Sequence, residues 1–272
     1  MSRCQDRLLV SLTQMPTYTR GVDPDQRIYR VFALDYLTRD IQDKKLTLSA
    51  PHKWSDPYED LPTWVGITTD DGKQFFFGNE APHVFGQCWT LEEESDAHWR
   101  LFGGVEPESV KVQASTTVRR LIEITSQSAP EATSIIGKVV YTENDMKQVV
   151  ADVLGKLGEQ AFADTFERSN LLLAKRRPFQ HEMEVRLLVF PQSATQEPTL
   201  RLPFEPNHLF EELMIGPQIA LGNLPPIEQR IRTAGYSGSI SRSELHQKVL
   251  LEVRLPNREF GAGSSQDAGN ID

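Results

Sequence analysis

Short stretches in which apolar and polar residues alternate recur along this chain and predict β-strands. The clearest is Ile28–Phe32, followed by a shorter apolar stretch at Leu46–Leu48. Asp71 and Gly72 are expected to form the turn of a hairpin within residues 70–79. The further strands predicted from the same pattern occupy residues 83–91, 109–115, 134–142, 180–190, 199–204, 212–219, 238–245 and 248–255.

Apolar positions three or four residues apart predict the helices between these strands. Asp35 is a plausible N-cap for a helix over residues 36–43, and a long or broken helix is expected over residues 143–175. The other predicted helices occupy residues 95–104, 116–125 and 225–234. Because strands and helices do not alternate regularly, we expect an α+β fold with mixed or antiparallel sheets and peripheral helices.

The chain predicts one principal domain. A Gly/Pro/Asp-containing turn ends at Gln26, so residues 1–26 are interpreted as an N-terminal extension and residues 27–260 as the domain. The last segment, residues 261–272, is rich in Gly and Ser and is expected to be a disordered tail.

Composition narrows the class of protein. The chain has 272 residues, 39% of them apolar, and a formal net charge of −9. An acidic chain repels nucleic acid and anionic membranes on average, and no apolar run is long enough to span a bilayer. The cysteines, Cys4 and Cys88, are far apart and form no metal-binding motif. We therefore expect a cytoplasmic protein with no membrane partner and no structural zinc.

The segment QHEMEVRLLVF, residues 180–190, carries the most informative pattern. As a strand, it places Glu182, Glu184 and Arg186 on one face, about 6.6 Å apart along the strand. Its other face is apolar and is expected in the core, through Met183, Val185, Leu187 and Val189. The charged face is either solvated, as in many antiparallel sheets, or directed at a site where paired carboxylates stabilise a cationic transition state.

Three other positions are candidates for ligand contact. Arg30 lies within an apolar strand, so it either binds an anion such as phosphate or occupies an exposed edge. Thr90, at a strand end, either meets a ligand or completes a turn. Trp89 beside it forms either an aromatic wall or part of the core.

The loop at residues 53–60 favours turn chemistry over catalysis. Asp56 and Glu59 lack a histidine or third acid nearby, which makes them a weak metal signal. The sequence contains no GxSxG, P-loop or GxGxxG motif.

Taken in order, these motifs resemble an uncharacterised bacterial family, catalogued as domain of unknown function 2971. The resemblance covers about residues 28–245. The motifs that carry it are Tyr29-Arg30, Ser55-Asp56-Pro57-Tyr58-Glu59, Cys88-Trp89-Thr90, Trp99, Lys175, the Phe179–Arg186 strand and Ile215-Gly216-Pro217.

The order Arg30, Thr90, then Glu182 and Glu184 is more distantly similar to ADP-ribosyltransferases. This resemblance implies their split β-sandwich fold and NAD as substrate, with no metal. Arg30 would hold the NAD phosphates or adjoining ribose, and Thr90 would position the nicotinamide side. Glu184 would stabilise the ribose cation, and Glu182 would orient or deprotonate the acceptor.

The resemblance also assigns lesser contacts. Tyr58 or Trp89 would stack on nicotinamide, while Lys175 and Arg177 either meet an acceptor phosphate or are solvated. The acceptor is open between protein, nucleic acid and nucleotide, and an antitoxin is a conceivable partner of a bacterial toxin or phage-defence enzyme.

Two other functions stay open. One is a non-enzymatic module that binds a nucleotide or a protein. The other is a metal-dependent nuclease that uses Asp56, Glu59, Glu182 and Glu184. A single cleft lined by Arg30, Thr90 and Glu184 would favour the transferase, whereas three acids converging without Arg30 would favour the nuclease.

Overall fold

The computed structural model describes residues 17–54, 56–60, 66–76, 84–102, 109–143, 146–157, 165–193 and 197–248. The strands are β1 Thr17–Arg20, β2 Arg27–Ala33, β3 Lys45–Ser49, β4 Gly66–Thr68, β5 Gln74–Phe76, β6 Phe85–Thr90, β7 Lys111–Thr117, β8 Thr133–Lys138, β9 Val140–Thr142, β10 Ala174–Arg176, β11 Glu184–Phe190, β12 Thr199–Pro203, β13 Glu212–Ile215 and β14 Ser239–Arg242. The α-helices are α1 Leu34–Asp43, α3 Asp96–Leu101, α4 Val118–Ser128, α5 Met146–Leu157, α6 Thr165–Leu172, α7 Pro206–Leu209 and α8 Leu224–Ala234. Short 3-10 helices are η1 Pro51–Lys53, η2 Pro57–Asp60, η5 Arg177–Glu182 and η6 Leu221–Asn223.

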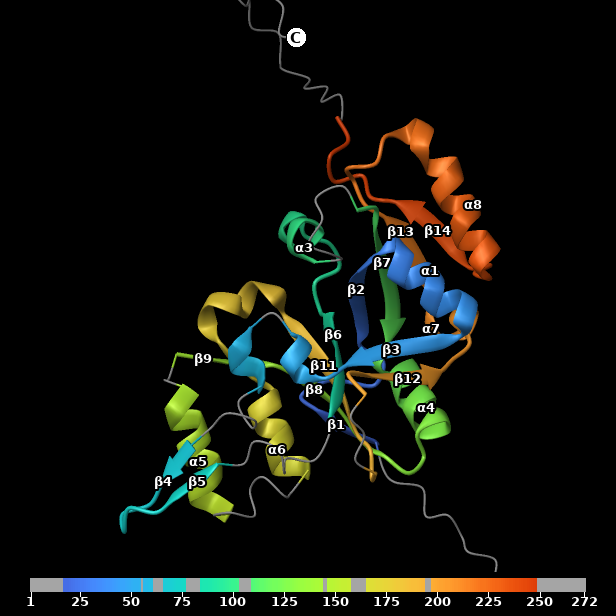
Figure 1. Ribbon diagram of the computed structural model, residues 1–272. Coiled ribbons are helices and arrows are strands. Elements are labelled where there is room, and N and C mark those ends of the chain that lie inside the picture. Colours follow the sequence, from blue (N-terminus) through green and yellow to red (C-terminus); the bar gives the residue numbers. More distant parts are fainter. Residues whose placement is uncertain are drawn as a thin grey trace, which may run out of the picture.

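One mixed sheet dominates the described part of the chain. Its central path runs β1-β8-β11-β6-β2-β7-β13-β14, and β3 joins it by pairing with both β6 and β12. The β1–β8 and β13–β14 pairs are parallel, while the others in this sheet are antiparallel. Helices α1 and α8 lie side by side at one end, and α5, α6 and the β4–β5 hairpin lie at the other (Figure 1). The predicted α+β class is confirmed.

The sheet separates next to β6. Strand β2 pairs with β6 only where Tyr29 faces Thr90, although it pairs with β7 along its whole length. Further along β6, Gly86 pairs with Ser49 of β3 instead. From β6 the sheet therefore continues in two directions, one through β2 and β7 and the other through β3. The main core packs between these two parts of the sheet, because its buried residues come from β2, β3, β6, β7 and β11 together. A cavity opens where β2 and β6 part.

Most sequence-predicted elements are present, with local corrections. Residues 134–142 form two strands, β8 and β9, and the predicted helix over 143–175 is divided into α5 and α6 and ends before β10. Within the predicted N-terminal extension, Thr17–Arg20 adds a strand to β8. The predicted strand over 248–255, apart from its first residue, and the predicted tail lie outside the described residues.

Asp35 does not cap α1. The helix begins at Leu34 directly after β2, so Ala33 occupies the N-cap and no side chain caps the helix. Asp35 lies in the first turn, where its carboxylate pairs with Arg230 at 2.6 Å. The prediction was wrong because strand and helix follow each other without a connecting turn.

The predicted strand over 180–190 begins only at Glu184. Pro178 lies at the start of η5, where its fixed φ suits the first helical turn, and η5 extends to Glu182. Met183 then adopts a left-handed conformation, with φ of 45°, and is 38% exposed rather than in the core. Val185, Leu187 and Val189 are buried as predicted.

None of the helices within the described residues is long and apolar enough to cross a membrane.

Candidate active site

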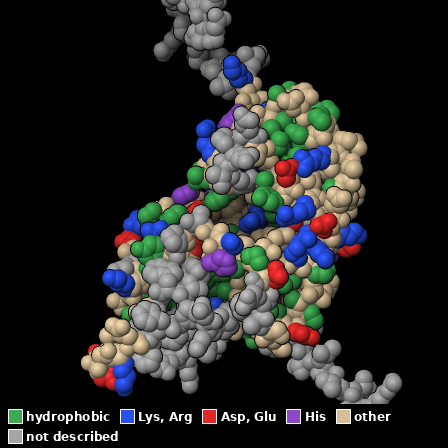
Figure 2. Space-filling view, viewed as in Figure 1, with side chains coloured by type: hydrophobic (Ala, Val, Ile, Leu, Met, Phe, Trp, Pro, Cys, Tyr) green, Lys and Arg blue, Asp and Glu red, His purple; other side chains and the backbone are tan. Residues whose placement is uncertain are grey.

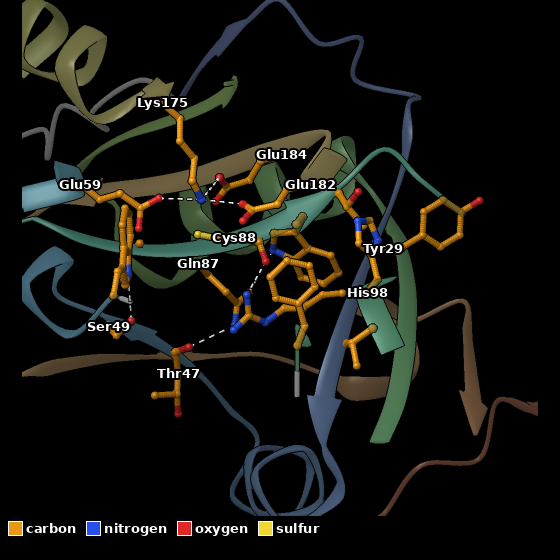
Figure 3. Close-up of a pocket in the computed structure, with 17 residues that line it drawn as sticks. Tyr29, Thr47, Ser49, Glu59, Gln87, Cys88, His98, Lys175, Glu182 and Glu184 are labelled. Carbon is orange, nitrogen blue, oxygen red and sulfur yellow. Dashed lines mark hydrogen bonds and ion pairs between the residues drawn. The ribbon is translucent and has the colours of Figure 1, made fainter. Parts of the chain in front are cut away.

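A cavity of about 230 Å³ lies where β2, β3 and β6 meet η2, η5 and α3. The surface is hollowed near the middle of the face shown in Figure 2. The lining brings together residues from distant parts of the chain, drawn in Figure 3: Tyr29, Arg30, Val31, Thr47, Ser49, Trp54, Glu59, Gly86, Gln87, Cys88, Trp89, Thr90, His98, Phe102, Lys175, Glu182 and Glu184.

Strand register brings Thr90 and Glu184 together. They are directly paired residues of β6 and β11, and Arg186 pairs with Cys88 two positions away on the same face. Directly opposed side chains have Cβ atoms about 4.5–5.5 Å apart. Thr90 also accepts a hydrogen bond from the backbone N–H of Glu92 at 3.0 Å. Thr90 therefore completes a turn and lines the cavity, so both of its expected roles are compatible.

Arg30 reaches the cavity through the gap between β2 and β6. Its Nη1 donates to the backbone carbonyl of Cys88, and its guanidinium carbon lies 5.0 Å from the centre of the Phe32 ring. Burial lowers the pKa of Arg30, and no carboxylate among the described residues forms an ion pair with it. At Arg30, β2 pairs with β7 on one side and is open toward β6 on the other, so Arg30 is half-buried at the gap between β2 and β6.

Three carboxylates surround the ammonium group of Lys175. Its Nζ lies 2.9 Å from Glu59 and 3.4 Å from Glu184, and it also contacts Glu182 (Figure 3). Only 6% of the Lys175 side chain is exposed. The alternative of a solvated charge is wrong, because the cluster holds Lys175 inside, whereas its predicted contact to an acceptor phosphate stays a prediction.

Arg186 is the second cation of the same cluster. The side chain is fully buried, and its Nε and Nη2 donate to the two carboxylate oxygens of Glu184 at 2.9 and 2.8 Å. It also contacts Glu59 and donates to the carbonyl of Leu172 at 2.6 Å. The indole of Trp54 stacks on it, with 4.8 Å between the guanidinium carbon and the ring centre. The charged face of β11 is therefore not solvated.

Glu184 and Glu182, two of the three glutamates of this cluster, have different pKa values. Burial would raise the pKa of Glu184, but Arg186 and Lys175 outweigh it and hold that pKa at about 2. Burial raises the pKa of Glu182, and contact with Lys175 offsets this only in part. Separated pKa values in one site are typical of a fixed anion beside a proton acceptor.

Of the remaining candidate residues, Trp89 lines this cavity, whereas Tyr58 and Arg177 do not. Trp89 lines the cavity but is 2% exposed, and its indole donates to Gln87 at 3.1 Å, so it serves as wall and core together. Tyr58 lies outside this cavity and packs on Arg176, with 4.3 Å from the guanidinium carbon to the ring centre. Arg177 pairs with Glu143 beside a second cavity.

Sequence reasoning missed several lining residues, including Gln87, His98 and the aromatic wall of Trp54. Glu59 was considered only as a metal-binding acid. Asp56 lies apart from the cluster and pairs with Arg176 at 3.0 Å. Ser55 of the same loop lies outside the described residues.

No family model matches the chain and no curated protein matches it, so membership of the uncharacterised family stays a prediction. Solved structures of DarT from Thermus sp. 2.9 do match. The complex with carba-NAD+ is 11% identical and covers 82% of this chain and 98% of that chain, with a TM-score of 0.36. The complex with ADP-ribosylated ssDNA is 11% identical and covers 85% and 98%, with a TM-score of 0.38. The complex with NAD+ is 12% identical and covers 82% and 98%, with a TM-score of 0.36.

The chain therefore has a distant resemblance to these DarT structures. At this identity and TM-score, it says nothing of the ligands or the activity of this chain.

Proposed function

We propose that this protein is an ADP-ribosyltransferase-like enzyme that cleaves NAD and transfers ADP-ribose to an acceptor. The observation that carries the proposal is that Arg30, Thr90, Glu182 and Glu184 line one cavity. They come from β2, β6, η5 and β11 and follow the chain order of that enzyme class.

Glu184 supplies the fixed negative charge in this proposal. When the bond between ribose C1′ and the nicotinamide nitrogen breaks, its electron pair leaves with nicotinamide and positive charge develops on the ribose. A carboxylate that stays ionised and is held by Arg186 needs no reorganisation to stabilise this charge. Thr90, which pairs with Glu184 across the two strands, orients the ribose through its hydroxyl group in this proposal.

Glu182 acts as the proton acceptor. Its raised pKa brings it closer to the range in which general bases operate. An acceptor hydroxyl or amine attacks C1′, forms the new glycosidic bond and gives its proton to Glu182. Unlike Glu184, this carboxylate lies on η5 and contacts only Lys175 among the described cations, so it can turn toward the acceptor.

Arg30 binds the anionic part of NAD. A half-buried guanidinium without a carboxylate partner is costly, and a phosphate relieves that cost through charge-assisted hydrogen bonds. The Nε atom of Arg30 is buried and has no partner among the described residues. The cavity of about 230 Å³ is smaller than the ~300–1,000 Å³ of pockets that enclose a whole ligand, so it takes only one end of NAD.

A module that binds NAD without cleaving it is the second candidate. Both oxygens of Glu184 are already engaged by Arg186, and one of them also contacts Lys175. A carboxylate this well satisfied is also suited to a purely structural role. The nuclease has less support, because Glu59, Glu182 and Glu184 converge on the ammonium of Lys175 and no group within the described residues has metal-binding geometry.

The test is release of nicotinamide from NAD, measured together with NAD affinity by calorimetry. We expect release by the native protein and a loss of about 100-fold or more for Glu182→Gln and Glu184→Gln. Glu228→Gln, at an exposed position of α8, is the matched control and should release nicotinamide at the native rate. Circular dichroism confirms that each variant is folded.

Two outcomes decide against this proposal. Binding without release by the native protein would favour the binding module. If the native protein neither binds NAD nor releases nicotinamide, both the transferase and the binding module are refuted. The acceptor, an antitoxin and a role as a toxin or defence enzyme stay predictions.

A further inference from the structure

His98 of α3 lines the same cavity from a position that the proposed chemistry does not use. The side chain is 1% exposed, and its Nε2 lies 3.1 Å from the backbone carbonyl of His181. A carbonyl oxygen can only accept, so Nε2 must carry the proton. Nδ1 of the neutral ring is then a hydrogen-bond acceptor.

That acceptor has no partner in the described part of the chain. Nδ1 of His98 is buried and receives no hydrogen bond there. Buried polar atoms in native proteins are nearly always satisfied, and an orphaned one calls for an explanation. Since His98 lines the cavity, a ligand that fills the cavity supplies the missing donor.

The ring is held firmly in place. Helix α3 is fixed at its end by Lys111, whose Nζ donates to the carbonyls of Trp99 and Arg100 at 2.8 and 3.1 Å. The indole of Trp99 donates to Glu94 at 3.0 Å, and Phe102 packs against the His98 ring with 5.2 Å between ring centres. A residue locked by such contacts suits selective recognition.

The carbonyl that His98 binds also matters, because His181 immediately precedes Glu182. The hydrogen bond from Nε2 therefore ties α3 to the segment that carries the proposed base. The two ring nitrogens differ: Nε2 supports η5, and Nδ1 has no partner among the described residues.

We propose that His98 is a specificity-determining residue, whose Nδ1 accepts a hydrogen bond from an N–H or O–H group of bound NAD. The inference rests on the proposed use of NAD. Two groups of NAD have the required chemistry, the carboxamide of nicotinamide and the ribose hydroxyls. Burial also lowers the pKa of His98, which keeps the ring neutral and Nδ1 free to accept.

Two substitutions separate the tasks of the ring nitrogens. His98→Gln keeps an N–H near the Nε2 position and removes the acceptor at the Nδ1 position. His98→Asn keeps an acceptor near the Nδ1 position and loses the bond to the His181 carbonyl. We expect His98→Gln to weaken NAD binding about tenfold, the effect of one unmade buried hydrogen bond, and His98→Asn to change it by less than about threefold.

Nicotinic acid adenine dinucleotide, which has a carboxylate in place of the carboxamide, identifies the donor. If the carboxamide is the donor, His98→Gln weakens calorimetric binding of NAD but not of this analogue. If a ribose hydroxyl is the donor, both weaken equally. Either result supports the inference.

Unchanged affinity of His98→Gln for both dinucleotides would overturn it, as would an equal loss in the Gln and Asn variants. If the variants do not fold, nitrogen NMR of the native protein decides instead, since Nδ1 of His98 must shift upfield when NAD is added. No native binding of either dinucleotide would refute the proposed function as well.

Discussion

Replacing Lys175 by methionine removes the cation at the centre of the buried acid cluster. Glu59 and Glu184 then retain Arg186 as a buried counterion, whereas Glu182 retains no ion pair among the described residues. Removing one partner of a buried ion pair costs about 3–5 kcal/mol, because the remaining charge is left uncompensated in a poorly solvated place. For a chain of this size, such a cost lowers the melting temperature by roughly 10 °C.

The loss should depend on pH and on Glu182. Burial already raises the pKa of Glu182, and without Lys175 that pKa lies further above its value in the unfolded chain. Stability of the variant is then lowest at neutral pH and returns as the pH falls through the raised folded value. Lys175→Met combined with Glu182→Gln removes one charge of each sign. We expect the double variant to be more stable than the sum of the single effects predicts, by about 0.5–3 kcal/mol.

Urea unfolding of the native protein, the single variants and the double variant at pH 7 and pH 5 measures these changes in the free energy of unfolding. Lys44→Met is the matched control, because Lys44 forms an exposed pair with Glu205 at 3.0 Å and should cost only about 0–1 kcal/mol. A loss for Lys175→Met no larger than the control would refute the reasoning. Strict additivity in the double variant would refute the coupling between Lys175 and Glu182.

Three further predictions follow from single residues. Gly86→Ala should destabilise the protein by about 1–3 kcal/mol in urea unfolding, because the new Cβ would lie 2.6 Å from the Trp54 ring, whereas Gly222→Ala meets nothing within 4 Å and should stay within about 0.5 kcal/mol. Glu184, with a pKa lowered from 4.5 to about 2, should contribute about 3 kcal/mol above its ordinary pKa and lose this as the pH falls to about 2, so Glu184→Gln should flatten the acid limb of the stability curve. Arg30→Met should weaken calorimetric NAD binding about 10- to 100-fold while costing no more than about 1–3 kcal/mol of stability; equal NAD affinity would count against a phosphate contact.

The periodic pattern predicted the strands of the site better than its helical segments. Residues 28–32 and 83–91 alternate or are continuously apolar, and β2 and β6 lie there. Both strands are fixed by local side-chain preferences and by burial on the core face, which sequence displays directly. That Arg30 and Thr90 share a site was implied by the resemblance to ADP-ribosyltransferases, and both line one cavity.

The alternating pattern predicted the wrong structure where a short helical segment has the same alternation as the strand that follows it. Residues 180–183 continue the alternation of β11, yet Pro178 starts a 3-10 helix and Met183 reverses the backbone with a positive φ. Alternation cannot distinguish these conformations over four residues. Glu182 nevertheless reaches the same ammonium as Glu184, because η5 turns its side chain back toward Lys175.

The position of Lys175 was beyond sequence reasoning for a different reason. It lies on β10, which is held beside β9 by parallel pairing of residues far apart in the chain. Only this pairing turns a cation of an apparently basic stretch, Lys175-Arg176-Arg177, into the centre of an acid cluster. Long-range pairing of a three-residue strand leaves no periodic signal.

The alternating sequence of residues 180–190 left two explanations of its charged face open, a solvated face and a face directed at a site. The charges of the cavity decide between them. A solvated strand face would place Glu184 and Arg186 in water, but both are buried, and the cluster around them has three carboxylates against two cations. Arg30, on the other side of the gap between β2 and β6, has no carboxylate partner among the described residues. The cavity is therefore negative at one side and positive at the other, and its ligand should carry a cation and an anion in one molecule. NAD does so, with a cationic nicotinamide ring and an anionic pyrophosphate, whereas a metal ion or a plain nucleotide satisfies only one side.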